Sequence, residues 1–121
     1  MKIFLVGYPG DLGGANTEAW HVIKLWRQFG IEVHLVPTWH ADETWKRRLD
    51  AIGCITHVSS PDKVESVPGL PGAITVGFCN SEYLRVAWKL RKLSCKIVWA
   101  NCMTFLFDHE KNFFRDRKSV V

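Results

Sequence analysis

Five short apolar runs alternate with helix-forming segments along this chain, and this alternation constrains its fold more than any other feature. The runs cover residues 2–6, 31–36, 54–58, 73–78 and 96–100. Between them, apolar residues recur at helical spacing, as they do from Asn16 to Phe29. Continuous apolar runs of this length are typical of strands buried on both faces. Their alternation with helices predicts a parallel sheet that helices cover on both sides.

The helical segments have recognisable ends and inward faces. The first helix is expected to begin near Asn16 and to end before Gly30, and Asp42 and either Asn80 or Ser81 are expected to cap the next two. The inward face of the first helix is predicted to carry Ala19, Trp20, Val22, Ile23, Trp26 and Phe29, and that of the third Leu84, Ala87, Trp88 and Arg91. Residues 59–72 hold three prolines and are expected to form a loop with one short helical turn. We therefore predict an α/β, Rossmann-like three-layer sandwich with a mainly parallel sheet of about five strands.

Composition excludes several classes of protein. With 121 residues, of which 47% are hydrophobic and 23% charged, the chain is expected to form a single domain over 1–121 and not a disordered segment. The formal net charge is +4, but the basic residues sit near helix ends instead of forming one stripe, so nucleic acid is not an expected partner.

Cysteine and hydropathy patterns indicate the expected compartment. The four cysteines form no C-x-x-C pair and show no zinc-site spacing, so we interpret them as reduced thiols and expect no metal. No signal peptide precedes the first strand, and no apolar run reaches the ~20 residues of a membrane span. These observations favour a cytoplasmic protein without a transmembrane segment.

A glycine-rich turn joins the first strand to the first helix, in the position where phosphates commonly bind. Gly7, Gly10 and Gly13 match a G-x-x-G-x-x-G spacing that dinucleotide-binding domains use. The second strand, however, ends in Pro37-Thr38-Trp39, with no acidic residue to bind a ribose. A nucleotide or dinucleotide site and a turn without any ligand therefore both stay open as alternatives.

The segment from Lys2 to Val36 resembles the start of a retaining, family 4-type glycosyltransferase of the GT-B fold. The likeness consists of an apolar strand, a proline-containing loop, Gly13-Gly14-Ala15, an amphipathic helix and the strand after Gly30. Residues 96–105, with Phe113-Phe114-Arg115, are similar to the strand, loop and helix that line the cleft in that family. The resemblance implies that the chain is the N-terminal, acceptor-side domain of an enzyme that transfers a sugar from a nucleotide-sugar donor to an acceptor.

The same resemblance has implications for partners and activity. Enzymes of this family bind the nucleotide mainly with a second domain that carries a Glu-x7-Glu motif, and no two glutamates here have that spacing. Val120-Val121 looks like the beginning of another strand, so we expect the N-terminal half of a longer two-domain protein, inactive alone and without a cofactor. A C-terminal domain, or a second copy of the chain as a homodimer, is the expected protein partner. The alternative is a nucleotide-binding or non-catalytic α/β interaction domain.

Two loops are the predicted ligand-binding site, and no catalytic residue is assigned. Both loops follow strands, and the carboxyl ends of parallel strands meet at one edge of a sheet. The predicted ligand-binding residues are Gly10, Asp11, Gly13, Gly14, Asn16, Asn101, Cys102, Met103 and Thr104. His34 and His57 lie in predicted strands and are interpreted as packed and hydrogen-bonded side chains.

Overall fold

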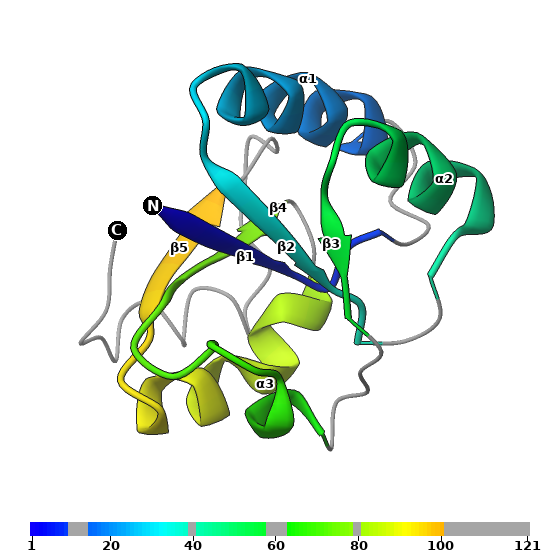
Figure 1. Ribbon diagram of the computed structural model, residues 1–121. Coiled ribbons are helices and arrows are strands. Elements are labelled where there is room, and N and C mark those ends of the chain that lie inside the picture. Colours follow the sequence, from blue (N-terminus) through cyan, green and yellow to red (C-terminus); the bar gives the residue numbers. More distant parts are fainter. Residues whose placement is uncertain (10–14, 39–40, 58–62, 79–80, 101–121) are drawn as a thin grey trace.

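A five-stranded parallel sheet forms the middle layer of the protein, as a computed structural model shows (Figure 1). The structure describes residues 1–9, 15–38, 41–57, 63–78 and 81–100. The strands are β1 (Lys2–Val6), β2 (Glu32–Val36), β3 (Ile55–Thr56), β4 (Ile74–Phe78) and β5 (Lys96–Ala100). They are arranged in the order β3-β2-β1-β4-β5, and each neighbouring pair is parallel. The predicted α/β, Rossmann-like sandwich with five parallel strands is therefore confirmed.

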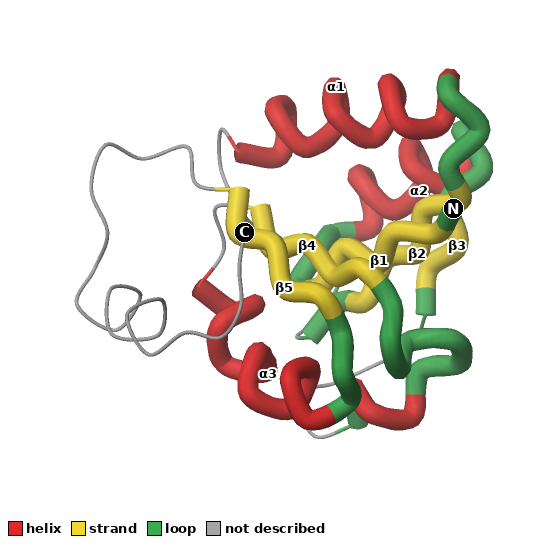
Figure 2. Tube along the Cα trace, turned by 90° about the vertical axis from the view of Figure 1, so that its left-hand side faces the viewer, coloured by secondary structure: helices red, strands yellow, loops and turns green. Residues whose placement is uncertain are grey.

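Helices cover both faces of the sheet. α1 (Ala15–Gln28) and α2 (Glu43–Ala51) lie over one face, and α3 (Ser81–Lys92) lies over the other together with the short 3-10 helix η1 (Val64–Ser66) (Figures 1 and 2). The short turn expected within residues 59–72 is η1. Asp42 caps α2 as predicted, because its carboxylate accepts a hydrogen bond from the Trp45 N–H at 3.0 Å.

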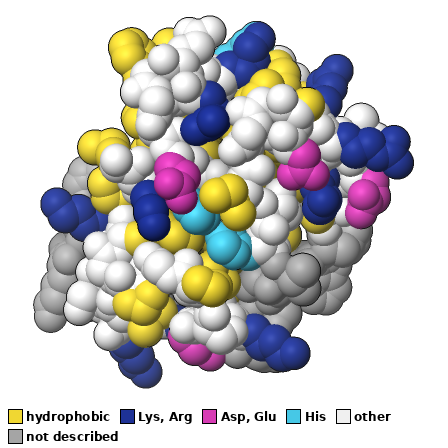
Figure 3. Space-filling view, in the orientation of Figure 1, with side chains coloured by type: hydrophobic (Ala, Val, Ile, Leu, Met, Phe, Trp, Pro, Cys, Tyr) yellow, Lys and Arg dark blue, Asp and Glu magenta, His cyan; other side chains and the backbone are white. Residues whose placement is uncertain are grey.

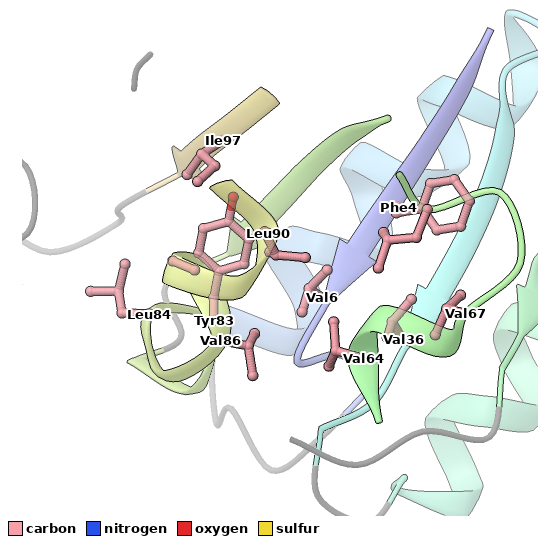
Figure 4. Close-up of a cluster of buried hydrophobic side chains, with 12 residues drawn as sticks. Phe4, Val6, Val36, Val64, Val67, Tyr83, Leu84, Val86, Leu90 and Ile97 are labelled. Atoms are coloured by element: carbon pink, nitrogen blue, oxygen red, sulfur yellow. The ribbon is translucent and has the colours of Figure 1, made fainter. Parts of the chain in front are cut away.

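Each face of the sheet carries its own cluster of buried side chains. The α3 face includes Phe4, Val36, Tyr83 and Leu90, and the α1 face includes Leu5, Ile23 and Leu49. Figure 4 shows Phe4 and Tyr83 toward opposite ends of the first cluster. Phe4 and Leu5 point to opposite faces because side chains alternate along a strand. The apolar runs are continuous for this reason.

Two aromatic side chains depart from their predicted positions. Phe29 was expected on the inward face of the first helix, but α1 ends at Gln28 and the Phe29 side chain is 76% exposed in the following turn. Trp88 was also expected to face inward, yet it is 46% exposed, with the Arg91 guanidinium 4.5 Å from its ring centroid. Helical spacing identifies a face but not its edges, and both residues lie beyond the part that contacts the sheet.

Arg27, near the end of α1, is a structural anchor. Its Nε donates a hydrogen bond to the Ile52 carbonyl and its Nη1 donates to the Ile31 carbonyl, both at 3.0 Å. These two carbonyls belong to the turn after α2 and to the residue before β2. One side chain therefore ties the end of α1 to two connections of the fold.

β3 is shorter than the apolar run that predicted it. The run covers residues 54–58, whereas the strand covers only Ile55–Thr56. Cys54 belongs to the preceding turn, where its N–H donates to the Leu49 carbonyl at 3.1 Å. His57 follows the strand, and its N–H donates to the Leu35 carbonyl at 2.9 Å. β3 thus lies at the edge of the sheet and is fastened to β2 along a few residues only.

Candidate functional site

The strand order places a topological switch point between β1 and β4. The chain passes from β1 to α1 on one face of the sheet and from β4 to α3 on the other. Figure 2 shows that α1 and α3 begin on the same side of the molecule, where β4 and β5 end. Ligands of open α/β sheets bind at the carboxyl ends of strands where the connections diverge in this way. This carboxyl edge is the candidate site.

Gly7 turns the chain at the end of β1. Its φ angle is +85°, a conformation that glycine adopts at no steric cost, and its N–H donates to the Val36 carbonyl at 2.8 Å. The turn therefore joins the carboxyl ends of β1 and β2. It also begins the glycine-rich segment that leads to α1, which starts at Ala15.

Tyr8 directs this segment towards the α1 side of the sheet. The side chain is 1% exposed and packs with the α1-face cluster. Burial raises the pKa of the Tyr8 hydroxyl well above its ordinary value of 10.0, with smaller contributions from Cys54 and Asp42. Tyr8 is consequently neutral at physiological pH and anchors the loop through packing.

Thr38 places a buried hydroxyl close to the end of β2. The residue is 2% exposed, and its Oγ1 makes no hydrogen bond within the part of the chain that the structure describes. Buried polar atoms nearly always have a partner, and an unsatisfied one costs about 1–3 kcal/mol. Sequence reasoning missed Thr38 because it looked for an acidic residue at this position, and a lone threonine carries no recognisable spacing.

The sequence-predicted site residues fall mostly outside the described residues. This applies to Gly10, Asp11, Gly13, Gly14, Asn101, Cys102, Met103 and Thr104. Asn16 lies in the first turn of α1, close to the predicted beginning of that helix. The strands that precede the two predicted loops, β1 and β5, end at the same edge and are separated by β4.

The thiols and acidic groups of the described residues do not form a second chemical centre. Cys54 and Cys95 carry free thiols, as predicted, and burial raises the pKa of Cys54 to about 11, which disfavours the reactive thiolate. No group of three or more His, Cys, Asp or Glu residues in the described ranges could hold a metal ion. Among the helices described, none is long and apolar enough to cross a membrane.

A shallow pocket lies far from the carboxyl edge. It is lined by Lys24, Arg27, Gln28 and Ile52, at the end of α1 opposite to its first turn. The Arg27 guanidinium in this pocket already donates hydrogen bonds to two backbone carbonyls. We therefore interpret the pocket as part of the structural contact that Arg27 makes and not as a ligand site.

Comparison of the chain with protein-family models, with curated proteins and with solved structures yields no significant match.

Proposed function

We propose that this chain binds the diphosphate of a nucleotide sugar at its carboxyl edge and forms the acceptor-side domain of a GT-B glycosyltransferase. The observation that supports this proposal best is the switch point between β1 and β4, with the Gly7 turn on one side of it. The resemblance of residues 2–36 and 96–115 to family 4-type enzymes narrows the ligand from an anion in general to a nucleotide sugar.

The first turn of α1 supports a phosphate ligand on physical grounds. The N–H groups at the beginning of a helix lack partners within the helix, and the helix dipole favours negative charge there. α1 is 14 residues long and starts directly after the glycine-rich segment. In the proposed reaction these N–H groups stabilise the negative charge that develops on the departing nucleoside diphosphate.

Thr38 offers a further polar contact at the same edge. Its hydroxyl can donate to a phosphate or ribose oxygen, which would satisfy a buried group that has no partner among the described residues. Because the residue at this position is neutral, it does not repel the diphosphate as an aspartate or glutamate would.

Transfer of the sugar is assigned to the combination of this chain with a second domain. No glutamate pair here has the Glu-x7-Glu spacing that the resembled family uses for the donor. We therefore expect the isolated chain to bind uridine or guanosine diphosphate sugars with dissociation constants weaker than about 10 µM and to transfer no sugar. Isothermal calorimetry and product analysis check this. Sub-micromolar binding or steady transfer by the chain alone would show that the half-enzyme proposal is wrong.

The position of the ligand can be tested with backbone amide signals in a nuclear magnetic resonance (NMR) titration. We expect a nucleotide sugar to shift the signals of Gly7 and Thr38. The signals of Gly30 and Gly72 serve as internal controls, because these residues precede β2 and β4 at the amino ends of the strands. Shifts confined to the control glycines would exclude the carboxyl edge, and stronger binding of a dinucleotide than of a nucleotide sugar would favour the alternative function.

A pair of charge variants tests whether the beginning of α1 faces the diphosphate. Thr17 in the first turn and Gln28 in the last are both exposed, and Glu18 already places one carboxylate in the first turn. We expect Thr17→Glu to weaken nucleotide-sugar binding about fivefold, which corresponds to about 1 kcal/mol. Gln28→Glu adds the same charge at the far end and should leave affinity unchanged. Equal effects of both variants would mean that net charge alone, not the helix N-terminus, determines binding.

A further inference from the structure

Two histidines and a glutamate form a continuous hydrogen-bonded chain on the α3 face of the sheet. Glu32 and His34 lie on β2, and His57 directly follows β3. His34 Nε2 is 2.6 Å from Glu32 Oε1, and His34 Nδ1 is 2.8 Å from His57 Nε2. Figure 3, in the orientation of Figure 1, shows two histidine side chains side by side at the surface, beside an acidic side chain.

The chemistry of the three groups determines where the protons are. The ionised Glu32 carboxylate can only accept, so His34 Nε2 carries the hydrogen and donates it. In a neutral His34 ring, Nδ1 is then an acceptor, so His57 Nε2 must donate to it. This arrangement leaves Nδ1 of a neutral His57 without a hydrogen.

The ring geometry indicates a shared proton and not a metal ion between the histidines. The ring centroids are 5.0 Å apart and the ring planes differ by only 13°. With the facing nitrogens 2.8 Å apart, this separation places both nitrogens close to the line between the two centroids. The two nitrogens therefore point at each other along one line. Metal chelation would require them to converge on a third point. Phe4 stacks on His34 with centroids 4.4 Å apart and holds that ring in place.

We propose that the Glu32–His34–His57 chain is a proton-operated latch that fastens the β3 edge of the sheet to β2 and releases it in acid. With one proton between the facing nitrogens, the hydrogen bond holds. A first added proton at His57 Nδ1 leaves that hydrogen bond in place, but it puts a positive charge on a partly buried ring beside His34 and so weakens the latch. A second proton gives both facing nitrogens a hydrogen at a separation of 2.8 Å, and the hydrogen bond is lost.

The electrostatics of the latch also involve charged groups outside its three residues. From β1, Lys2 and the amino terminus both act on Glu32, whose pKa is lowered mainly by its hydrogen bond with His34. From η1, Glu65 lies 3.9 Å from Lys89 of α3. Because its pKa is lowered, Glu32 stays ionised where His57 changes charge, so the pH effect follows from His57 and not from Glu32.

The direction of the pH effect follows from the His57 ring. Burial, with a smaller contribution from His34, lowers the pKa of His57 below its ordinary value of 6.5. Below pH 6.5 the released His57 ring binds more protons than the hydrogen-bonded one. The hydrogen bond therefore stabilises the β3 edge fully above pH 6.5. This stabilisation is lost as the pH falls through the lowered pKa of His57. We expect release on acidification and not on alkalinisation.

Amide hydrogen exchange measures the latch directly. The His57 N–H donates to the Leu35 carbonyl and reports whether the end of β3 is fastened, while the Lys96 N–H, which donates to the Ala73 carbonyl, serves as a reference. After correction for intrinsic exchange, we expect protection of His57 relative to Lys96 to fall at least tenfold between pH 7.5 and 4.5. Unchanged relative protection over this range would overturn the proposal.

Two variants and one spectrum distinguish an effect of the latch from a general loss of stability in acid. His57→Gln keeps an N–H donor but does not titrate, so most of the pH dependence should disappear. His21→Gln changes an exposed side chain of α1 and should behave as wild type. A His57→Gln variant with the wild-type pH dependence contradicts the latch. If that variant fails to fold, nitrogen-15 spectra of the wild-type rings decide at pH 7.5: both histidines should carry hydrogen on Nε2, and any other tautomer refutes the chain.

Discussion

Gly77→Ala should destabilise the protein by about 3 kcal/mol or more, since an added methyl group overlaps a buried ring. A Cβ atom at Gly77 would lie 2.2 Å from Tyr83 Cγ, 2.4 Å from its Cδ2 and 2.6 Å from its Cβ. Real Cβ atoms essentially never come this close to a neighbour. The overlap is with the base of the side chain, so rotation of the ring does not remove it.

Tyr83 cannot move aside because hydrogen bonds and packing hold it. The residue is fully buried, its hydroxyl lies 3.0 Å from Thr75 Oγ1, and Thr75 Oγ1 donates to the Lys96 carbonyl at 2.7 Å. Burial raises the pKa of the Tyr83 hydroxyl well above its ordinary value, so it stays a neutral hydrogen-bonding group. These contacts connect α3 with β4 and β5. A methyl group at position 77 would displace Tyr83 and disrupt them.

Denaturant unfolding of matched variants tests this account. Gly30 has a φ angle of +77° and nothing within 4 Å of an added Cβ, so Gly30→Ala carries backbone strain alone and should cost roughly 1–2 kcal/mol. In a double-mutant cycle, Gly77→Ala combined with Tyr83→Ala should be less destabilising than the sum of the single variants. Additive effects, or a Gly77→Ala cost no larger than that of Gly30→Ala, would contradict a steric clash.

Phe4→Ala should cost about 3–5 kcal/mol, the range observed when a buried phenyl ring is deleted. Phe4 is fully buried, stacks on His34 and contacts the α3-face cluster around Val67 (Figure 4). Its Cζ lies 3.6 Å from the position of a Cβ at Gly69, so the ring also supports the segment that leads into β4. Truncation leaves a cavity between the sheet and that segment.

Phe29→Ala is the matched control for this experiment. It removes the same atoms from a side chain that is 76% exposed, and the free energy of unfolding should change by no more than about 0.5 kcal/mol. Thermal or denaturant unfolding of the two variants provides the comparison. Similar losses from both would mean that the burial of Phe4 does not determine its contribution.

The Phe4 variant also connects the core with the proposed latch. Phe4 covers one face of the His34 ring, and its centroid lies 6.1 Å from that of His57. Phe4→Leu keeps most of the apolar volume and loses the flat stacking surface. A loss of relative His57 protection in Phe4→Leu already at pH 7.5 would show that the stacked ring positions the hydrogen-bonded chain.

The local features of the fold could be predicted because local interactions determine them. Apolar runs identified β1, β4 and β5 to within a residue, since helices cover both faces of the sheet and leave few strand positions for polar side chains. The Asp42 cap was predictable for a similar reason, because a cap is a contact between a side chain and a backbone N–H three residues away.

Contacts between distant residues could not be predicted in this way. His34 and His57 are 23 positions apart and meet only because β3 lies next to β2. Gly77 and Tyr83 are close in the sequence, yet only the packing of α3 on β4 brings the ring against the glycine. Arg27 belongs to an amphipathic helix, and the two carbonyls that it binds come from other connections of the fold.

For the candidate site, the sequence alone determined that a glycine-rich segment follows the first strand and precedes an amphipathic helix. The tertiary structure decided that this segment starts beside the switch point, because the order β3-β2-β1-β4-β5 makes β4 the neighbour of β1. It also decided that Thr38 is a buried hydroxyl at the same edge. Periodicity in a sequence reports which residues avoid water, whereas strand order and register, set by packing over the whole domain, determine which of them meet.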